Sequence, residues 1–130
     1  MMNRKKKGRH HKSKVDKHQP APITDGVKTV VLDLVIADIE SNTITNSELT
    51  NAVLRDLQLR SHQGFMKYGT LLCLDNGRDS LMDFYQEVLD AVVYLRQFIA
   101  EYPDEAVFAL PVYHMVWEVA TVTRDELDRC

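Results

Sequence analysis

One short segment, Asp79–Asp90, combines regularly spaced acids with an otherwise apolar surface, and this pattern limits the folds open to the chain. Its four acids are Asp79, Asp83, Glu87 and Asp90. On a helix that turns about 100° per residue they fall within an arc of roughly 80°. The remaining positions up to residue 95 are almost all apolar. Because a helix that is apolar nearly all round is usually buried, we expect a buried helix whose acidic side faces a positive charge.

The chain has 130 residues, which is the length of one domain. Its cysteines, Cys73 and Cys130, have neither metal-type nor redox-type spacing, so we expect no disulfide framework and a cytoplasmic protein. No uninterrupted apolar run approaches the roughly 18 residues that span a membrane, and we expect no membrane contact.

The charge of the chain is divided unevenly. Residues 1–18 hold eight Lys or Arg residues against one acid, a balance of +7, whereas the rest holds 8 against 18, a balance of -10. We expect residues 1–23 to form a disordered basic tail that can make weak, sequence-independent contact with nucleic acid. The alternative is a tail that only solubilises the protein or folds back on the acidic body. We expect residues 24–130 to form a single all-α domain.

Hydrophobic periodicity and capping signals predict four helices joined by short loops. The first covers about 26–40, capped by Thr24 or Asp25, with strand as the minority alternative because of its β-branched residues. The second begins at the cap Ser47, runs to Phe65–Tyr68 with Leu49, Val53, Leu57 and Phe65 facing inward, and ends at Gly69. The third covers about 78–101. The fourth covers 104–128 and is broken near Pro111, although its run 116–123 is rich in residues that favour strands. The predicted architecture is a helical bundle of three to four helices.

Carboxylates aligned over two or three helical turns suit a hard divalent cation such as Mg²⁺. The helix before them carries Arg60 and Lys67 on one face, together with Asp56 and Gln63. Arg60 and Lys67, with Arg78 at the start of the acidic helix, would suit phosphate oxygens. If the acidic and the basic helix faces lie opposite each other, they form a cleft for a polyphosphate, and Tyr94 could face that cleft. The other interpretation is that the acids form a solvated surface and that Arg60 and Lys67 make weak salt bridges to them.

The motif Glu87-Val-Leu-Asp90, preceded by Arg60, by Gly64-Phe-Met-Lys67-Tyr-Gly69 and by Asn76-Gly-Arg-Asp79, carries a resemblance over residues 48–102. This part of the chain resembles the MazG-like all-α nucleoside triphosphate pyrophosphohydrolases, particularly small phage-encoded members. That family has an E-x-x-E on one helix and an E-x-x-D on the next, which together hold Mg²⁺. Glu87 and Asp90 match the second motif. The first is missing, and Asp79 and Asp83 are the candidates for the absent ligands.

The resemblance implies a Mg²⁺-dependent enzyme that cleaves a (d)NTP between its α- and β-phosphates, in a bacterial or phage-infected cytoplasm. It implies Asp83, Glu87 and Asp90 as catalytic metal ligands, with Arg60, Lys67 and Arg78 on the phosphates. It also implies homo-oligomers, which a thin core of two long helices per chain would favour. The alternative function is a non-catalytic helical adaptor with a basic tail that binds nucleic acid.

Overall fold

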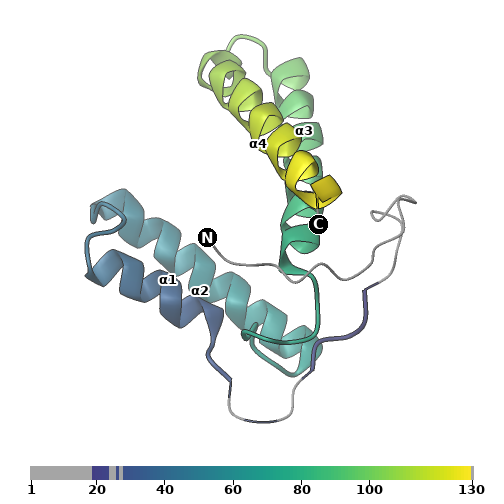
Figure 1. Cartoon of the computed structure of the whole chain (residues 1–130). Helices are drawn as coiled ribbons and strands as arrows, with labels where there is room; N and C mark the ends of the chain where they lie inside the picture. Colours follow the sequence, from purple (N-terminus) through teal and green to yellow (C-terminus); the bar gives the residue numbers. More distant parts are fainter. Residues whose placement is uncertain (1–18, 24–25, 27, 130) are drawn as a thin grey trace. The chain divides into compact units, whose positions relative to one another are not determined.

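The computed structural model describes residues 19–23, 26 and 28–129. Within these residues the regular elements are all helical, so the predicted all-α class is confirmed. They are α1 (Val31–Glu40), α2 (Glu48–Tyr68), α3 (Ser80–Glu101), the short 3-10 helix η2 (Ala106–Phe108) and α4 (Ala109–Arg129). The chain divides into two compact units (Figure 1). One is Pro20–Arg78, and the other contains Gln19 and the chain from Asp79 onward.

In the first unit α1 packs against α2, and both predicted ends of α2 are confirmed. The Ser47 side chain accepts a hydrogen bond from the backbone N–H of Thr50 at 3.1 Å, which satisfies one of the free donors at the helix start. Gly69 has φ 74°, and its N–H donates to the carbonyl of Phe65 at 2.8 Å. This left-handed conformation is easily reached by glycine, so the chain leaves the helix here.

The predicted start of the first helix was wrong, because α1 begins at Val31 instead of near residue 26. Thr24 and Asp25, the predicted caps, lie outside the described residues. Val30 is extended and forms an isolated antiparallel bridge with Cys73, through the bonds Val31 N–Leu72 O and Leu74 N–Thr29 O, both 2.9 Å. Val30 is therefore extended, because a loop distant in sequence provides hydrogen-bond partners for the backbone of its neighbours Thr29 and Val31.

The predicted inward face of α2 was also wrong. Leu49, Val53, Leu57 and Phe65 are all exposed, and none of the residues of α2, each of which is described, is buried. The physical reason is the size of the partner: within its unit the 21-residue α2 packs on a helix of only 10 residues. A short helix cannot cover an apolar face that extends over about six turns.

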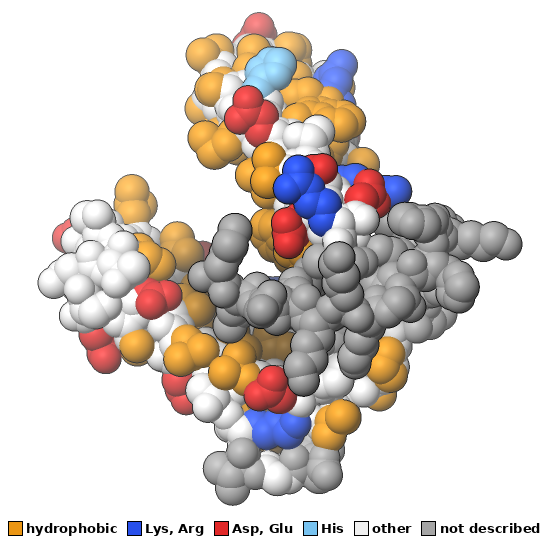
Figure 2. Space-filling view, viewed as in Figure 1, with side chains coloured by type: hydrophobic (Ala, Val, Ile, Leu, Met, Phe, Trp, Pro, Cys, Tyr) orange, Lys and Arg blue, Asp and Glu red, His pale blue; other side chains and the backbone are white. Residues whose placement is uncertain are grey.

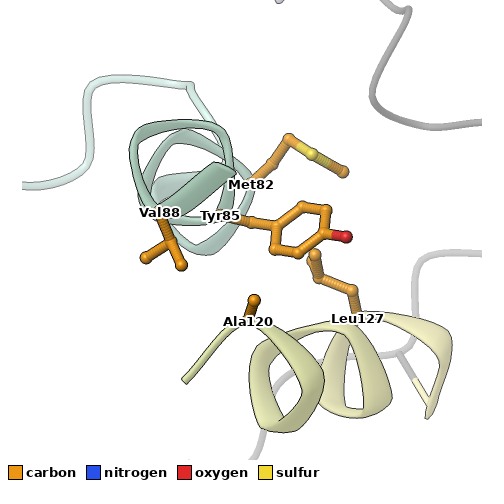
Figure 3. Close-up of a cluster of buried hydrophobic side chains, with 5 residues drawn as sticks. All are labelled: Met82, Tyr85, Val88, Ala120 and Leu127. Carbon is orange, nitrogen blue, oxygen red and sulfur yellow. The ribbon is translucent and has the colours of Figure 1, made fainter. Parts of the chain in front are cut away.

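In the second unit α3 packs along α4 over a small core. Met82, Tyr85 and Val88 of α3 are buried against Ala120 and Leu127 of α4. Figure 3 shows the ring of Tyr85 extending from α3 toward the side chains of α4. Hydrogen bonding with Tyr85 and the charge of Asp128 raise the pKa of Arg124 above its ordinary value. On α3 the buried residues follow each other at intervals of three, and on α4 the two lie seven residues apart, so each set lies on one side of its helix.

Two features of α3 and α4 differ from prediction. First, α3 is buried only on the side that meets α4, and Phe84, Val93 and Tyr94 are exposed. Second, Pro111 does not break α4, because it is the third residue of that helix. A proline in the first helical turn lacks an N–H that would have had no intrahelical partner, so the helix continues through it. The helical segment instead changes from the 3-10 helix η2 to the α-helix α4 between Phe108 and Ala109, without an interruption.

The helical segment Ala106–Arg129 is largely apolar. Among the described residues it is the one helical segment long and apolar enough, by length and composition, to cross a membrane. Only 22% of its most apolar window is buried inside the structure. Core helices of soluble proteins also meet this criterion of length and composition. What the structure shows is that the segment forms a large exposed apolar surface.

Candidate functional site

The acidic residues of α3 lie on the side of the helix away from α4. Asp83 follows the buried Met82 by one position, and Glu87 and Asp90 continue the stripe one and two turns further along. At about 100° per residue, the centre of this stripe is roughly opposite the side chains that pack on α4. The stripe contains no Lys or Arg between Asp79 and Asp90. The α3–α4 packing therefore leaves this acidic surface outside the core.

Asp79 caps α3. The helix begins at Ser80, and Oδ1 of Asp79 accepts hydrogen bonds from the backbone N–H groups of Leu81 and Met82 at 3.1 and 3.2 Å. The sequence predicted a helix that starts at residue 78, with Asp79 inside it as a metal ligand. The capping role of Asp79 was not predicted. A carboxylate at this position also interacts favourably with the positive end of the helix dipole.

Gln19 binds the first turn of the same helix and was not foreseen. Its Nε2 donates to Oδ1 of Asp83 at 2.6 Å, and its Oε1 accepts the backbone N–H of Asp79, also at 2.6 Å. The amide thus joins the helix cap to the next acid of the stripe. Gln19 lies 60 residues before Asp79 in the predicted tail, so no sequence spacing could have indicated the contact.

Glu87 and Asp90 are exposed, whereas Asp83 is half-buried beside Gln19. The described residues contain no group of three His, Cys, Asp or Glu side chains already placed to hold one metal ion. What the structure provides is a pair of exposed carboxylates at positions i and i+3 of a continuous helix. Mg²⁺ commonly uses one or two protein carboxylates and keeps several waters, so such a pair agrees with its chemistry.

The predicted phosphate-binding cations belong to the other unit. Arg60 and Lys67 are exposed on α2, and Nζ of Lys67 lies 5.0 Å from the centre of the Tyr68 ring. Arg78 is half-buried, and its Nη1 donates to the carbonyl of Pro20 at 2.9 Å. Tyr94, predicted to border the site, is exposed on α3. The guanidinium group of Arg78 thus makes a hydrogen bond to a backbone carbonyl of its own unit.

No protein-family model, curated protein or solved structure matches this chain.

Proposed function

We propose that the chain is a Mg²⁺-dependent nucleoside triphosphate pyrophosphohydrolase. In this reaction a water oxygen attacks the α-phosphorus, the bond between that phosphorus and the α–β bridging oxygen breaks, and a (d)NMP and pyrophosphate leave. The observation that carries the proposal is the pair Glu87 and Asp90, exposed at i and i+3 on the side of α3 away from its core. The resemblance of residues 48–102 to MazG-like enzymes supports the same reading.

Glu87 and Asp90 supply the oxygen ligands that Mg²⁺ prefers, and Asp83, one turn before Glu87, is the candidate for a further ligand. When bound, the ion would polarise the phosphate and lower the pKa of a coordinated water. Without it, neighbouring carboxylates of one stripe repel each other. The resemblance to MazG-like enzymes implies that Arg60, Lys67 and Arg78 would neutralise the phosphates of the substrate and of the leaving pyrophosphate.

Pyrophosphate release from ribo- and deoxynucleoside triphosphates with Mg²⁺ tests the activity directly. We expect Glu87→Gln and Asp90→Asn each to lower kcat/KM by at least about 100-fold, because each removes a charged ligand from a reaction that the ion assists. Asp104→Asn is the matched control: it removes one exposed acid that lies outside the stripe and should leave kcat/KM unchanged. Absence of pyrophosphate with every nucleotide would end the proposal.

Thermal unfolding with and without Mg²⁺ tests metal binding apart from catalysis. A ligand that binds only the folded state raises Tm by mass action, so Mg²⁺ should raise the Tm of the wild type and of Asp104→Asn. Mg²⁺ should raise the Tm of Asp90→Asn much less. An equal shift in all three proteins would mean that the stripe does not bind the ion.

A second candidate is a non-catalytic helical adaptor whose residues 1–18 contact nucleic acid. It is favoured by the missing E-x-x-E and by the fact that, among the described residues, no third donor joins Glu87 and Asp90. It predicts nucleic-acid binding that weakens steeply with salt and disappears when residues 1–18 are deleted. Equal binding by the shortened protein would remove it.

A further inference from the structure

The carboxylate of Asp83 is held at the start of α3, beside the helix cap. Nε2 of Gln19 donates to Oδ1 of Asp83 at 2.6 Å, and the same nitrogen lies 3.4 Å from the backbone oxygen of Asp79. At its other end the amide accepts the backbone N–H of Asp79 through Oε1. Side chains of an α-helix tilt toward its N-terminus, and Gln19 binds Asp83 on that side. The carboxylate is therefore fixed toward the cap.

This position keeps Asp83 apart from the exposed pair Glu87 and Asp90. Along the helix axis Glu87 lies about 6 Å and Asp90 about 10 Å beyond Asp83. Within the part of the chain that the structure describes, no three acidic, His or Cys side chains gather around one point. Asp83 can join the pair only by turning its carboxylate toward Glu87, which moves that carboxylate away from Gln19. The contact with Gln19 thus opposes a site of three carboxylates.

Gln19 differs in kind from the partners of the acids on α4. Asp128 of α4 forms an ion pair with Arg124 at 3.0 Å. Figure 2 shows acidic and basic side chains gathered together near the C-terminal end of that helix. Gln19 gives Asp83 a hydrogen bond but brings no opposite charge, and a neutral amide cannot neutralise a carboxylate. A cation can therefore compete with this amide.

The residues that follow Gln19 are bound independently of it. The carbonyl of Pro20 accepts a hydrogen bond from Nη1 of Arg78 at 2.9 Å, and the N–H of Ile23 donates to the carbonyl of Asn76 at 2.7 Å. Loss of the contact between Gln19 and α3 breaks neither of these bonds. The amide can therefore leave the helix while the segment after it stays in place.

We propose that Gln19 is a latch that competes with a divalent cation for Asp83. In the metal-free protein the amide holds the carboxylate at the cap, and Asp83 leaves Gln19 when it joins Glu87 and Asp90 as an oxygen ligand. The full charge of a cation attracts a carboxylate more strongly than the partial charge of an amide does. The inference rests on the metal site of the proposed function. It makes Gln19, which lies outside the segment that resembles MazG-like enzymes, a positioning residue that sets the affinity for the ion.

Calorimetric titration with Mg²⁺ tests the latch through binding alone. We expect Gln19→Ala to lower the Kd for Mg²⁺ about tenfold, because the ion no longer replaces a hydrogen bond to a charged group. Gln97→Ala is the matched control: Gln97 donates to Oε1 of Glu101 at 2.8 Å on the same helix, and its loss should leave the Kd unchanged. In an Asp83→Asn background, Gln19→Ala should no longer change the Kd.

The side-chain amide signals of Gln19 in nitrogen-proton NMR spectra report on the latch in the wild type. Their absence from the spectrum of Gln19→Ala identifies them. Saturating Mg²⁺ should move them toward the positions of an exposed glutamine, and those of Gln97 should stay where they are. This measurement needs no variant that has to match the wild type in stability.

Three results would overturn the latch. They are an equal or higher Kd for Mg²⁺ in Gln19→Ala, an effect of that variant that persists beside Asp83→Asn, and Gln19 signals that saturating Mg²⁺ leaves unmoved. The enzymatic proposal fails separately. Pyrophosphate release with an unchanged Kd in Gln19→Ala would keep the enzyme and remove the latch. Displacement of the Gln19 amide without pyrophosphate release would keep the latch and remove the enzyme.

Discussion

Gln19 joins two acidic residues at the start of α3: its Nε2 donates to Oδ1 of Asp83 at 2.6 Å, and its Oε1 accepts the backbone N–H of Asp79, also at 2.6 Å. The side-chain amide of Gln19 thus bonds to the backbone of the helix-capping residue Asp79 and also to one carboxylate oxygen of Asp83, a predicted metal ligand. The contact links the start of α3 to a residue 60 positions earlier.

Removal of the Gln19 amide should destabilise the protein. We expect Gln19→Ala to lower the free energy of unfolding by about 1–2 kcal/mol, because one hydrogen bond to a charged group and one to a backbone N–H are lost. Urea unfolding measures the change, with the exposed Gln63→Ala of α2 as the control that should have little effect. If Asp83 is a ligand, the same variant should also bind Mg²⁺ more tightly. A stability equal to that of the wild type would show that the amide contact contributes nothing.

The capping role of Asp79 can be separated from a role as ligand. Asp79→Ala should cost about 1 kcal/mol of stability, whereas Asp79→Ser should cost less because serine also caps helices. A ligand role predicts that the serine variant loses part of the Mg²⁺-dependent rise in Tm while keeping its stability in the absence of the ion. Equal destabilisation by Ala and Ser would argue against the cap.

Gly64 inside α2 and Gly69 immediately after its end should respond in opposite directions to replacement by alanine. A Cβ added at Gly69 meets nothing within 4 Å, so Gly69→Ala costs only the strain of its φ of 74°, about 1 kcal/mol. Gly64 is inside the helix with open space around its Cα, and Gly64→Ala should stabilise by about 0.5–1 kcal/mol. Urea midpoints of the two variants, measured side by side, check the prediction. The same sign for both would contradict it.

Leu127 should be the most sensitive apolar residue of α4. It is 2% exposed and lies in the core with Met82 and Tyr85, so Leu127→Ala should cost about 2 kcal/mol or more. Leu110→Ala, at a position of the same helix that is 49% exposed, should cost less than about 1 kcal/mol. Both should be measured at one protein concentration, because association contributes to apparent stability. A reversed order would mean that the core lies elsewhere.

Local signals predicted most helix boundaries correctly. Ser47 and Gly69 determine the ends of α2 because capping depends only on neighbouring residues. The start of α1 did not follow from local signals, since the backbone of Thr29 and Val31 pairs with the loop at Leu72–Leu74. The β-rich run 116–123 is helical because its spacing matches the surface of α3, and tertiary packing overrides a weak intrinsic preference.

The sequence by itself determined the all-helical class and the grouping of the acids on one side of α3, because both follow from residue spacing along a single helix. Only the tertiary structure decided which apolar stripe of α4 is buried, that Asp79 caps α3, and that Gln19 meets Asp83. Each of these depends on which segments distant in sequence come together, and spacing along one element carries no information about its partners.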